Sequence, residues 1–354
     1  MSIRLLQDAL RESQSAALIF SEENGFYFTG FASSNAVLFV TADAALYFTD
    51  SRYLEAAKQQ ITSCDEVRDL QSFEKSVLPA IETSGAKTIA VEGERLNVVQ
   101  YQKLQKAMPD VTLTTDTLDK LINQIRSVKT QDELDKIMHA QQIAEQALDL
   151  LRPQIKVGAV ERELALTLDY TMQKLGAQAV SFETILISGK ETSKPHGVPS
   201  DKKIERGDFV TIDFGALYHG YHSDMTRTFA VGEVSDKQAE IYDTVLQAQL
   251  AGLNALAPGK VCKDVDAVSR EIIKTAGYGD CFGHGLGHGV GVEIHEFPYL
   301  NPRCDAALQV GNVVTVEPGI YIPDFCGVRI EDMALITADG RANLTNYPKD
   351  LIIL

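Results

Sequence analysis

The first third of the chain alternates short apolar runs with amphipathic stretches, which is the pattern of a mixed α/β domain. The pattern predicts strands at residues 16–20, 37–40, 45–48, 88–91 and 111–114, with a hairpin turn at 41–43. It predicts helices over residues 1–15 and 98–108, and a further helix through 53–57 that is capped by Asp50. No glycine-rich phosphate loop or nucleophile elbow follows these strands. We therefore expect no chemistry in this part.

A second domain is expected to begin at residues 123–130, which gives domain ranges of 1–125 and 126–354. Thr130-Gln131-Asp132-Glu133 is a capping box, and it predicts a long helix that ends near residue 152. A chain of 354 residues is long enough for two such domains, and its 45% hydrophobic content supplies their cores.

An internal repeat organises the second domain. Amphipathic helices are bracketed by glycines eighteen positions apart, first at Gly158 and Gly176 and again at Gly259 and Gly277. Each pair follows a long helical pattern, at residues 133–151 and 236–256. The shared spacing predicts two related halves.

The repeat continues into two predicted strands, GDFVTIDFG and GNVVTVEPG. Each places an acid six residues after its first glycine, at Asp213 and Glu317. The order of elements predicts a pseudo-twofold domain in which these acids meet at a central sheet.

Each of these acids is paired with a second acid across a predicted hairpin. Asp213 and Asp224 flank the segment LYHG and are expected to face each other, and Glu317 and Glu331 are expected to face each other around Asp324. The surrounding residues are apolar, and facing carboxylates repel unless a cation lies between them. Four carboxylates on two hairpins suit a pair of metal ions.

Histidines supply further candidates, because six of the seven lie between His196 and His295. Glycines in the segment HGLGHGVGVEIHEFP, which includes His284, His288 and His295, allow a close approach of the backbone to a site. His139 is expected to be structural, and His219 and His222 are expected at the surface or behind the site.

Composition excludes several classes of partner. A net charge of −16 opposes binding to nucleic acid. No apolar run is long enough to span a membrane, and the N-terminus lacks the apolar region of a signal peptide. Five scattered cysteines, none with zinc-site spacing, predict reduced thiols in a cytoplasmic protein; Cys281 is not expected to bind metal.

The order D-x10-D, HGxGHGxGxxxHExP, VEPG and RIED resembles the pita-bread metallopeptidases, specifically the branch of aminopeptidase P and prolidase. The resemblance covers the whole chain. It implies an α/β (α+β) protein, with a creatinase-like mixed α/β domain followed by a pseudo-twofold pita-bread catalytic domain. It also implies a dinuclear, metal-dependent peptidase that hydrolyses Xaa-Pro bonds in proline-containing peptides, and a homodimer.

The resemblance assigns roles by position in these motifs. The implied metal ligands are Asp213, Asp224, His288, Glu317 and Glu331. The implied catalytic residues are His196, His295 and Glu317, and the implied substrate-binding residues are Phe182, His284 and Arg329. Two divalent ions are expected; the family favours Mn²⁺ or Co²⁺, and the ligand types also suit Zn²⁺ or Fe²⁺.

Three other functions compete with this interpretation. A methionine aminopeptidase shares the catalytic domain, but the N-terminal domain and the HExP context argue against it. A creatinase-like hydrolase would be metal-free and would lack the carboxylate set. A non-catalytic binding module would have lost ligands, whereas all five positions are retained here.

The substrate preference depends on the residues after HExP. A strict dipeptidase needs a cation for the free carboxylate of Xaa-Pro, and prolidases typically carry arginine there. This chain has Tyr299 directly after the proline, although Arg303 or Arg329 could reach a carboxylate. The departure favours an Xaa-Pro aminopeptidase that acts on peptides of three or more residues, with an Xaa-Pro dipeptidase as the alternative.

Overall fold

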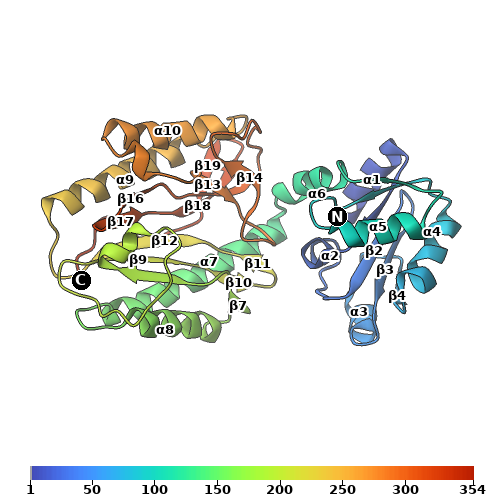
Figure 1. Ribbon diagram of the computed structural model, residues 1–354, viewed down its shortest axis with the longest axis horizontal. Helices are drawn as coiled ribbons and strands as arrows, with labels where there is room; N and C mark the ends of the chain where they lie inside the picture. The colour runs from blue at the N-terminus through green and yellow to red at the C-terminus, as the bar shows by residue number, and fades with distance from the viewer. Residues whose placement is uncertain (1) are drawn as a thin grey trace. The chain divides into compact units, whose positions relative to one another are not determined.

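The computed structural model describes residues 2–354, which form two compact units that divide between Arg126 and Ser127. The first unit contains a six-stranded mixed sheet in the order β4-β3-β2-β1-β5-β6 (Figure 1). Its strands are β1 (Ala16–Ile19), β2 (Ala36–Val40), β3 (Ala45–Thr49), β4 (Glu66–Asp69), β5 (Thr88–Val91) and β6 (Thr112–Thr114). Its helices are α1 (Ser2–Ser13), α2 (Glu22–Thr29), α3 (Leu54–Gln60), α4 (Leu78–Ser84), α5 (Val98–Ala107) and α6 (Leu118–Ser127), and a π-helical turn, Phe73–Val77, precedes α4.

Apolar side chains on both faces of this sheet are buried. Leu38 and Val40 of β2 pack in a core with α1, α2, α3 and α6, whereas Val37 and Phe39 pack in a second core with α4 and α5. Because successive side chains of a strand point to opposite faces, a sheet covered on both sides requires nearly continuous apolar strands.

The predicted strands of this unit are all present, but the pattern missed several other elements. β4 is partly exposed and has the sequence EVRD, so it carries no apolar run. The predicted cap at Asp50 was wrong: α3 begins at Leu54 without a side-chain cap. The Asp50 carboxylate instead binds the Arg52 guanidinium, and it accepts a hydrogen bond from the Asn35 amide at 2.8 Å.

The second unit contains four α-helices among its described residues, together with several small sheets. The helices are α7 (Gln131–Leu151), α8 (Glu161–Lys174), α9 (Asp236–Ala255) and α10 (Cys262–Thr275), and 3-10 turns lie at Arg152–Gln154, Gly189–Ser193 and Gly279–Cys281. The first-half strands are β7 (Ala179–Val180), β8 (Ile185–Ser188), β9 (Phe209–Phe214), β10 (Ala216–Tyr218), β11 (Tyr221–His222) and β12 (Met225–Ala230). The second-half strands are β13 (Gly287–Gly289), β14 (Glu296–Leu300), β15 (Val313–Val316), β16 (Gly319–Ile322), β17 (Cys326–Arg329), β18 (Asp332–Thr337) and β19 (Gly340–Asn343).

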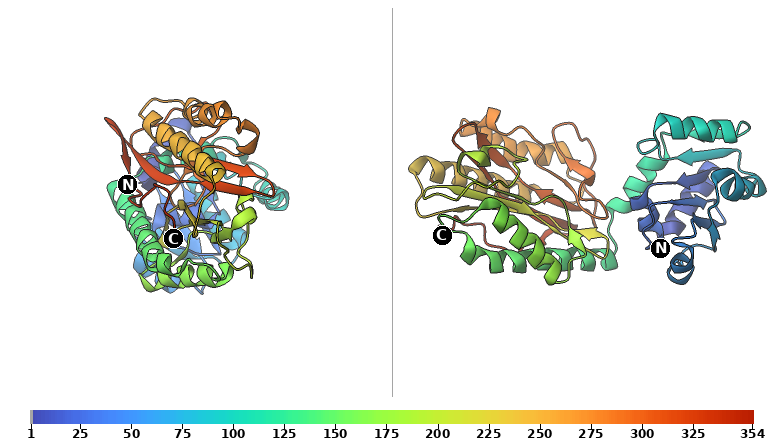
Figure 2. Two further views of the ribbon diagram at one scale, coloured as in Figure 1. Left: turned by 90° about the vertical axis from the view of Figure 1, so that its left-hand side faces the viewer. Right: turned by 60° about the horizontal axis from the view of Figure 1, so that its bottom comes forward.

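Strands of the second unit lie between two pairs of helices. Figure 1 and both views of Figure 2 show α7 and α8 on one side of the strands, and α9 and α10 on the other. One apolar core joins α7 and α8 to β8, β9 and β12, and another joins α9 and α10 to β15, β17 and β18. The predicted capping box is present, because Glu133 accepts hydrogen bonds from the Thr130 N–H at 2.8 Å and the Thr130 hydroxyl at 2.6 Å.

Backbone hydrogen bonds confirm the repeat of the two halves. The Gly158 N–H donates to Ile204, and at the same place in the second half the Gly259 N–H donates to Leu308, both at 2.8 Å. All four glycines that bracket α8 and α10 have positive φ angles, between 80° and 111°, and glycine adopts this conformation without a steric penalty.

Strand register confirms one predicted acid pair and corrects the other. In the second half, the β16–β17 and β15–β18 pairings share one register, which sets Glu317 opposite Glu331 with Asp324 at the turn. In the first half, Asp213 pairs with Thr226, so the expected direct opposition of Asp213 and Asp224 was wrong by two positions. The cause is the turn, which is centred on His219-Gly220 with φ angles of 47° and 77°.

Among residues 2–354, no helix is both long and apolar enough to cross a membrane.

Candidate metal centre

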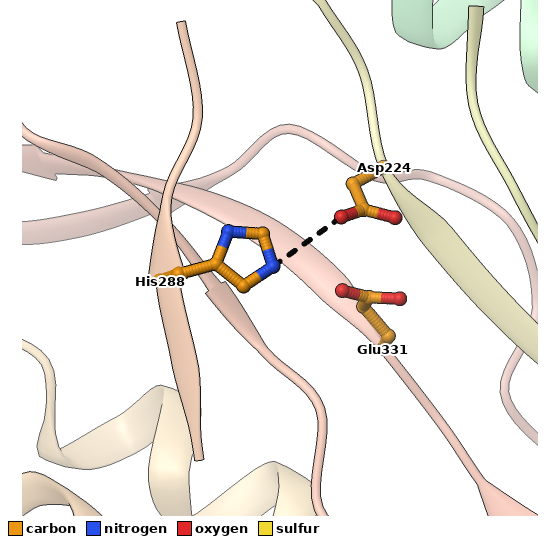
Figure 3. Close-up of side chains that lie close together, drawn as sticks. All are labelled: Asp224, His288 and Glu331. Atoms are coloured by element: carbon orange, nitrogen blue, oxygen red, sulfur yellow. Dashed lines mark ion pairs between the residues drawn. The ribbon is translucent and has the colours of Figure 1, made fainter. Parts of the chain in front are cut away.

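Three side chains from separate segments of the chain converge in the second unit. Asp224 directly precedes β12, His288 lies in β13, and Glu331 lies between β17 and β18. Each offers one ligand atom, and these atoms all lie within 4.8 Å of one another. Figure 3 shows the three side chains pointing toward a common centre. All three residues are buried, with exposed fractions of 4%, 7% and 1%.

The tautomer of His288 follows from its neighbours. Its Nδ1 lies 3.0 Å from the Gly289 carbonyl, which can only accept a hydrogen bond, so Nδ1 carries the proton. In the neutral ring Nε2 then carries an unprotonated lone pair, which a metal ligand requires. This Nε2 lies 3.3 Å from Glu317 Oε1 and 3.5 Å from Asp224 Oδ2.

The carboxylates of this site destabilise one another. Burial and the charges of Glu331, Asp213 and Glu317 raise the pKa of Asp224 well above its usual value. Burial and the charges of Glu317 and Asp213 do the same to the pKa of Glu331. Burial also opposes the charged form of Glu317, but in the metal-free site a protonated His288 donates to Glu317, outweighs this effect and holds the pKa of Glu317 at about 2. Burial lowers the pKa of His288, but Glu317 outweighs it and raises this pKa, so the neutral ring that binds metal requires a cation to replace the proton.

Asp213 joins the site through an ion pair with Arg329. Asp213 Oδ2 lies 2.5 Å from Arg329 Nη2. Burial raises the pKa of Asp213 although Arg329 opposes the shift. Arg329 Nη1 also donates to the Tyr321 hydroxyl at 2.8 Å, and that hydroxyl lies 2.9 Å from His284 Nε2. Tyr321, which sequence analysis missed, thus links the predicted residues His284 and Arg329.

The donor set fits divalent metal ions. Among the described residues, two buried carboxylate oxygens, Asp213 Oδ1 and Asp224 Oδ1, have no hydrogen-bond partner. Several carboxylates share a small buried volume, and this arrangement is unfavourable without a compensating cation. Carboxylates with one imidazole are a common ligand set for divalent ions.

The glycine-rich segment packs its backbone closely against β14 and β15. A Cβ atom on Gly287 would lie 2.1 Å from the Thr315 carbonyl oxygen, and one on Gly291 would lie 2.4 Å from a Glu296 carboxylate oxygen. At Gly283, directly before this segment, a Cβ atom would meet nothing within 4 Å. His295 lies in the same segment, and the centre of its ring lies 4.3 Å from that of His288.

A cleft of about 810 Å³ contains the residues selected from sequence. It is lined by Phe182, His196, Asp213, Asp224, His284, His288, His295, Glu317, Arg329 and Glu331. The other histidines lie apart from this lining: His219 is in an exposed turn, and His139 packs against Tyr218 with ring centres 4.2 Å apart. His222 is half-buried outside the lining, its Nδ1 is 3.2 Å from the Ser181 hydroxyl, and burial lowers its pKa to about 4.

Sequence analysis also missed contacts that support the lining. Lys129 Nζ lies 2.7 Å from Glu296 Oε1, and both side chains are almost fully buried. Arg270, on α10, binds the Asp266 carboxylate and donates to the backbone carbonyls of Phe282 and His284 at 3.0 and 2.7 Å. Lys129 and Glu296 lie far apart in the sequence and follow no recognisable motif, so only the fold reveals this pair. Asp266 and Arg270 are four residues apart on α10, but the carbonyls that Arg270 reaches could not be identified from that spacing.

Comparisons with known proteins agree with this architecture. Residues 135–338 match the metallopeptidase family M24, and residues 3–128 match the creatinase/prolidase N-terminal domain. The Xaa-Pro dipeptidase of Pyrococcus furiosus is 40% identical over 338 residues, which cover 93% of this chain and 92% of that protein.

Solved structures give the same result. The Xaa-Pro dipeptidase from Bacillus anthracis is 40% identical, has a TM-score of 0.95, and is matched over 100% of this chain and 99% of that chain. The X-Pro aminopeptidase from Thermotoga maritima is 38% identical, has a TM-score of 0.89, and is matched over 96% and 97% of the two chains. The family implies divalent metal ions, in agreement with the cluster of Asp224, His288 and Glu331. The chain belongs to metallopeptidase family M24, in the Xaa-Pro peptidase branch, and combines a creatinase-like N-terminal domain with a pita-bread catalytic domain.

Proposed function

We propose that this peptidase is an Xaa-Pro aminopeptidase, which releases the first residue from peptides of three or more residues whose second residue is proline. The observation that carries this proposal is the side chain at position 299. Tyr299 directly follows the HExP proline, is 41% exposed and lines the cleft. A phenol at this place supplies no charge for the free carboxylate of a dipeptide.

The proposed ligands are Asp213, Asp224, His288, Glu317 and Glu331, and they would hold two divalent ions, Mn²⁺ or Co²⁺. Such ions, when bound, act as Lewis acids and lower the pKa of water toward neutrality.

The chain's own groups then orient the substrate and move the proton. Burial lowers the pKa of His295, so this ring is neutral near pH 7 and can donate one hydrogen bond to a developing oxyanion. His196, which also lines the cleft, is proposed to contact the same substrate. Glu317 Oε1 is proposed to accept the proton of the attacking water and pass it to the departing proline nitrogen.

Proline itself explains the apolar wall of the cleft. The Xaa-Pro bond is a tertiary amide without an N–H, so the enzyme needs no acceptor for that nitrogen before cleavage. Phe182 and Val198 line the cleft, and Val198 is 75% exposed. These side chains provide an apolar surface for the pyrrolidine ring.

Arg303 favours a second candidate, an Xaa-Pro dipeptidase. This arginine lines the cleft, is exposed, and makes no side-chain hydrogen bond or ion pair within residues 2–354. A guanidinium in this position suits bidentate binding of a substrate carboxylate.

Kinetics on matched substrates separate the two candidates. The measurement compares kcat/KM for Xaa-Pro and for Xaa-Pro-Yaa-Zaa with the same Xaa residue. A preference for the dipeptide above about tenfold, or ~1.4 kcal/mol, would contradict the aminopeptidase proposal. In that event Arg303→Met should raise KM for Xaa-Pro but not for Xaa-Pro-amide, which lacks the carboxylate.

The choice of Mn²⁺ or Co²⁺, the homodimer and the cytoplasmic location stay predictions. Elemental analysis of purified protein and light scattering test the first two directly.

A further inference from the structure

One buried carboxylate holds both ends of the chain segment 189–199. Glu161 lies in the first turn of α8 and is 0% exposed. Its Oε1 accepts hydrogen bonds from the Ser188 N–H and the Ser188 hydroxyl, both at 2.7 Å. Its Oε2 accepts from the Ser200 N–H at 3.1 Å and from the Ser200 hydroxyl at 2.7 Å.

The segment between these two serines carries His196. Elsewhere it is held by the Thr192 hydroxyl, which accepts a hydrogen bond from the Gly327 N–H at 2.7 Å, and by the Pro195 carbonyl, which accepts from Arg329 at 3.3 Å. His196 is exposed in the cleft, and its ring makes no hydrogen bond to any residue in the described part of the chain. The backbone of the segment therefore determines where the ring lies.

The internal repeat provides a comparison within the same molecule. In the first half, the Glu161 and Arg162 N–H groups donate to the carbonyls of Lys202 and Ser200, at 3.1 and 3.0 Å. In the second half, the Cys262 and Lys263 N–H groups donate in the same way to Ala306 and Cys304, at 2.9 and 3.0 Å.

Cys262 thus takes the place of Glu161 in the second half. The backbone pairing there forms without any carboxylate at this position. The backbone pairing at the start of α8 therefore does not explain why the first half buries a glutamate at this position. The four hydrogen bonds that Glu161 accepts from Ser188 and Ser200, the residues that flank segment 189–199, do explain it.

We propose that Glu161 is a positioning residue for His196, and that its carboxylate fixes the segment on which this histidine meets the substrate. The inference rests on the proposed role of His196. Each oxygen accepts one backbone N–H and one hydroxyl, and hydrogen bonds to an ionised acceptor are stronger than neutral ones. Lys202 Nζ donates to the Ser188 hydroxyl at 2.9 Å and so places a positive charge in the same network.

Glu161→Gln tests the proposal, because the amide keeps one acceptor and turns the other into a donor that faces a backbone N–H. Hydrogen exchange on the metal-loaded enzyme should then rise roughly tenfold in peptides covering 186–202 and stay unchanged elsewhere in the second unit. kcat/KM should fall between about tenfold and about 100-fold, mainly through kcat. Metal content should not change. Glu163→Gln, an exposed glutamate on the same helix, is the matched control and should behave as wild type.

A double-mutant cycle with His196→Ala gives the decisive comparison. If Glu161 acts through His196, Glu161→Gln should have little further effect in the His196→Ala enzyme. Full additivity of the two losses, or unchanged exchange in the segment, would overturn the proposal. Ser200→Ala removes only the hydroxyl hydrogen bond to Glu161, so exchange in the segment should rise and kcat/KM should fall by smaller factors. This variant keeps the proposal testable if Glu161→Gln does not fold. Full activity of His196→Ala alone would instead contradict the proposed function. The exchange data would still test whether Glu161 holds segment 189–199 in place.

Discussion

Asp224→Asn should change stability in opposite directions in the metal-free and the metal-loaded protein. Asp224 is 4% exposed, its Oδ1 has no partner among residues 2–354, and the charges of Glu331, Asp213 and Glu317 surround it. Asparagine has nearly the same shape without the charge. In metal-free protein the substitution therefore removes a repulsive charge, whereas in loaded protein it removes a proposed ligand.

The sign of the pH dependence follows from the raised pKa of Asp224. The folded state binds this proton more tightly than the unfolded state, so metal-free wild type loses stability as pH rises from the unfolded pKa through the folded one. Asp224→Asn lacks this loss. We expect it to stabilise metal-free protein at pH 8 by about 1–3 kcal/mol, the usual penalty for an unsatisfied buried group, and by less at pH 5.

Metal binding should reverse the order of stability, so that wild type becomes more stable than Asp224→Asn. At a free metal concentration of 100 Kd, wild type should gain about 2.7 kcal/mol per ion. For a unit of this size the gain corresponds to a rise in Tm of roughly 5–10 °C. Asp224→Asn should lose at least one ion and most of that rise.

Scanning calorimetry at pH 5 and pH 8, with and without Mn²⁺, measures both effects, and elemental analysis gives the metal content. Asp243→Asn, an exposed acid on α9, is the control and should change neither. A destabilised metal-free variant at pH 8 that keeps the full metal-induced rise in Tm would refute the assignment of Asp224 as a ligand.

Three further predictions test other parts of the site. A chelator should abolish activity, and Mn²⁺ or Co²⁺ should restore it; full activity in verified metal-free protein would contradict the proposed centre. His295→Ala and His196→Ala should each lower kcat by roughly 10²–10⁴ at unchanged metal content, whereas His288→Ala should lose metal; equal metal loss in His295→Ala would reverse the two assignments. Lys129→Met should lower the free energy of unfolding by about 3–5 kcal/mol, because the buried Glu296 carboxylate loses its cation. Urea unfolding measures this loss, and a change below about 1 kcal/mol would contradict it.

Local patterns in the sequence predicted many of the elements, for identifiable physical reasons. The strands of the first unit are buried on both faces, so they appear as apolar runs, and the capping box at Thr130 is a contact between near neighbours. Elements without such signals were missed. β4 lies at the edge of its sheet and is partly exposed, so neither of its faces needs apolar residues.

The sequence alone determined which residue types could form the site, because acids in buried strands need partners and the spacing of the repeat relates Asp213 to Glu317. It did not determine the strand register, because a turn shifted by one residue changes every cross-strand pair. Here the shifted turn set Asp213 opposite Thr226 and not opposite Asp224. Contacts between distant segments were decided only by the tertiary structure. They include the Lys129–Glu296 pair and the hydrogen bonds from Ser188 and Ser200 to Glu161. These contacts depend on how separate helices and strands pack together, and no local periodicity in the chain encodes that packing.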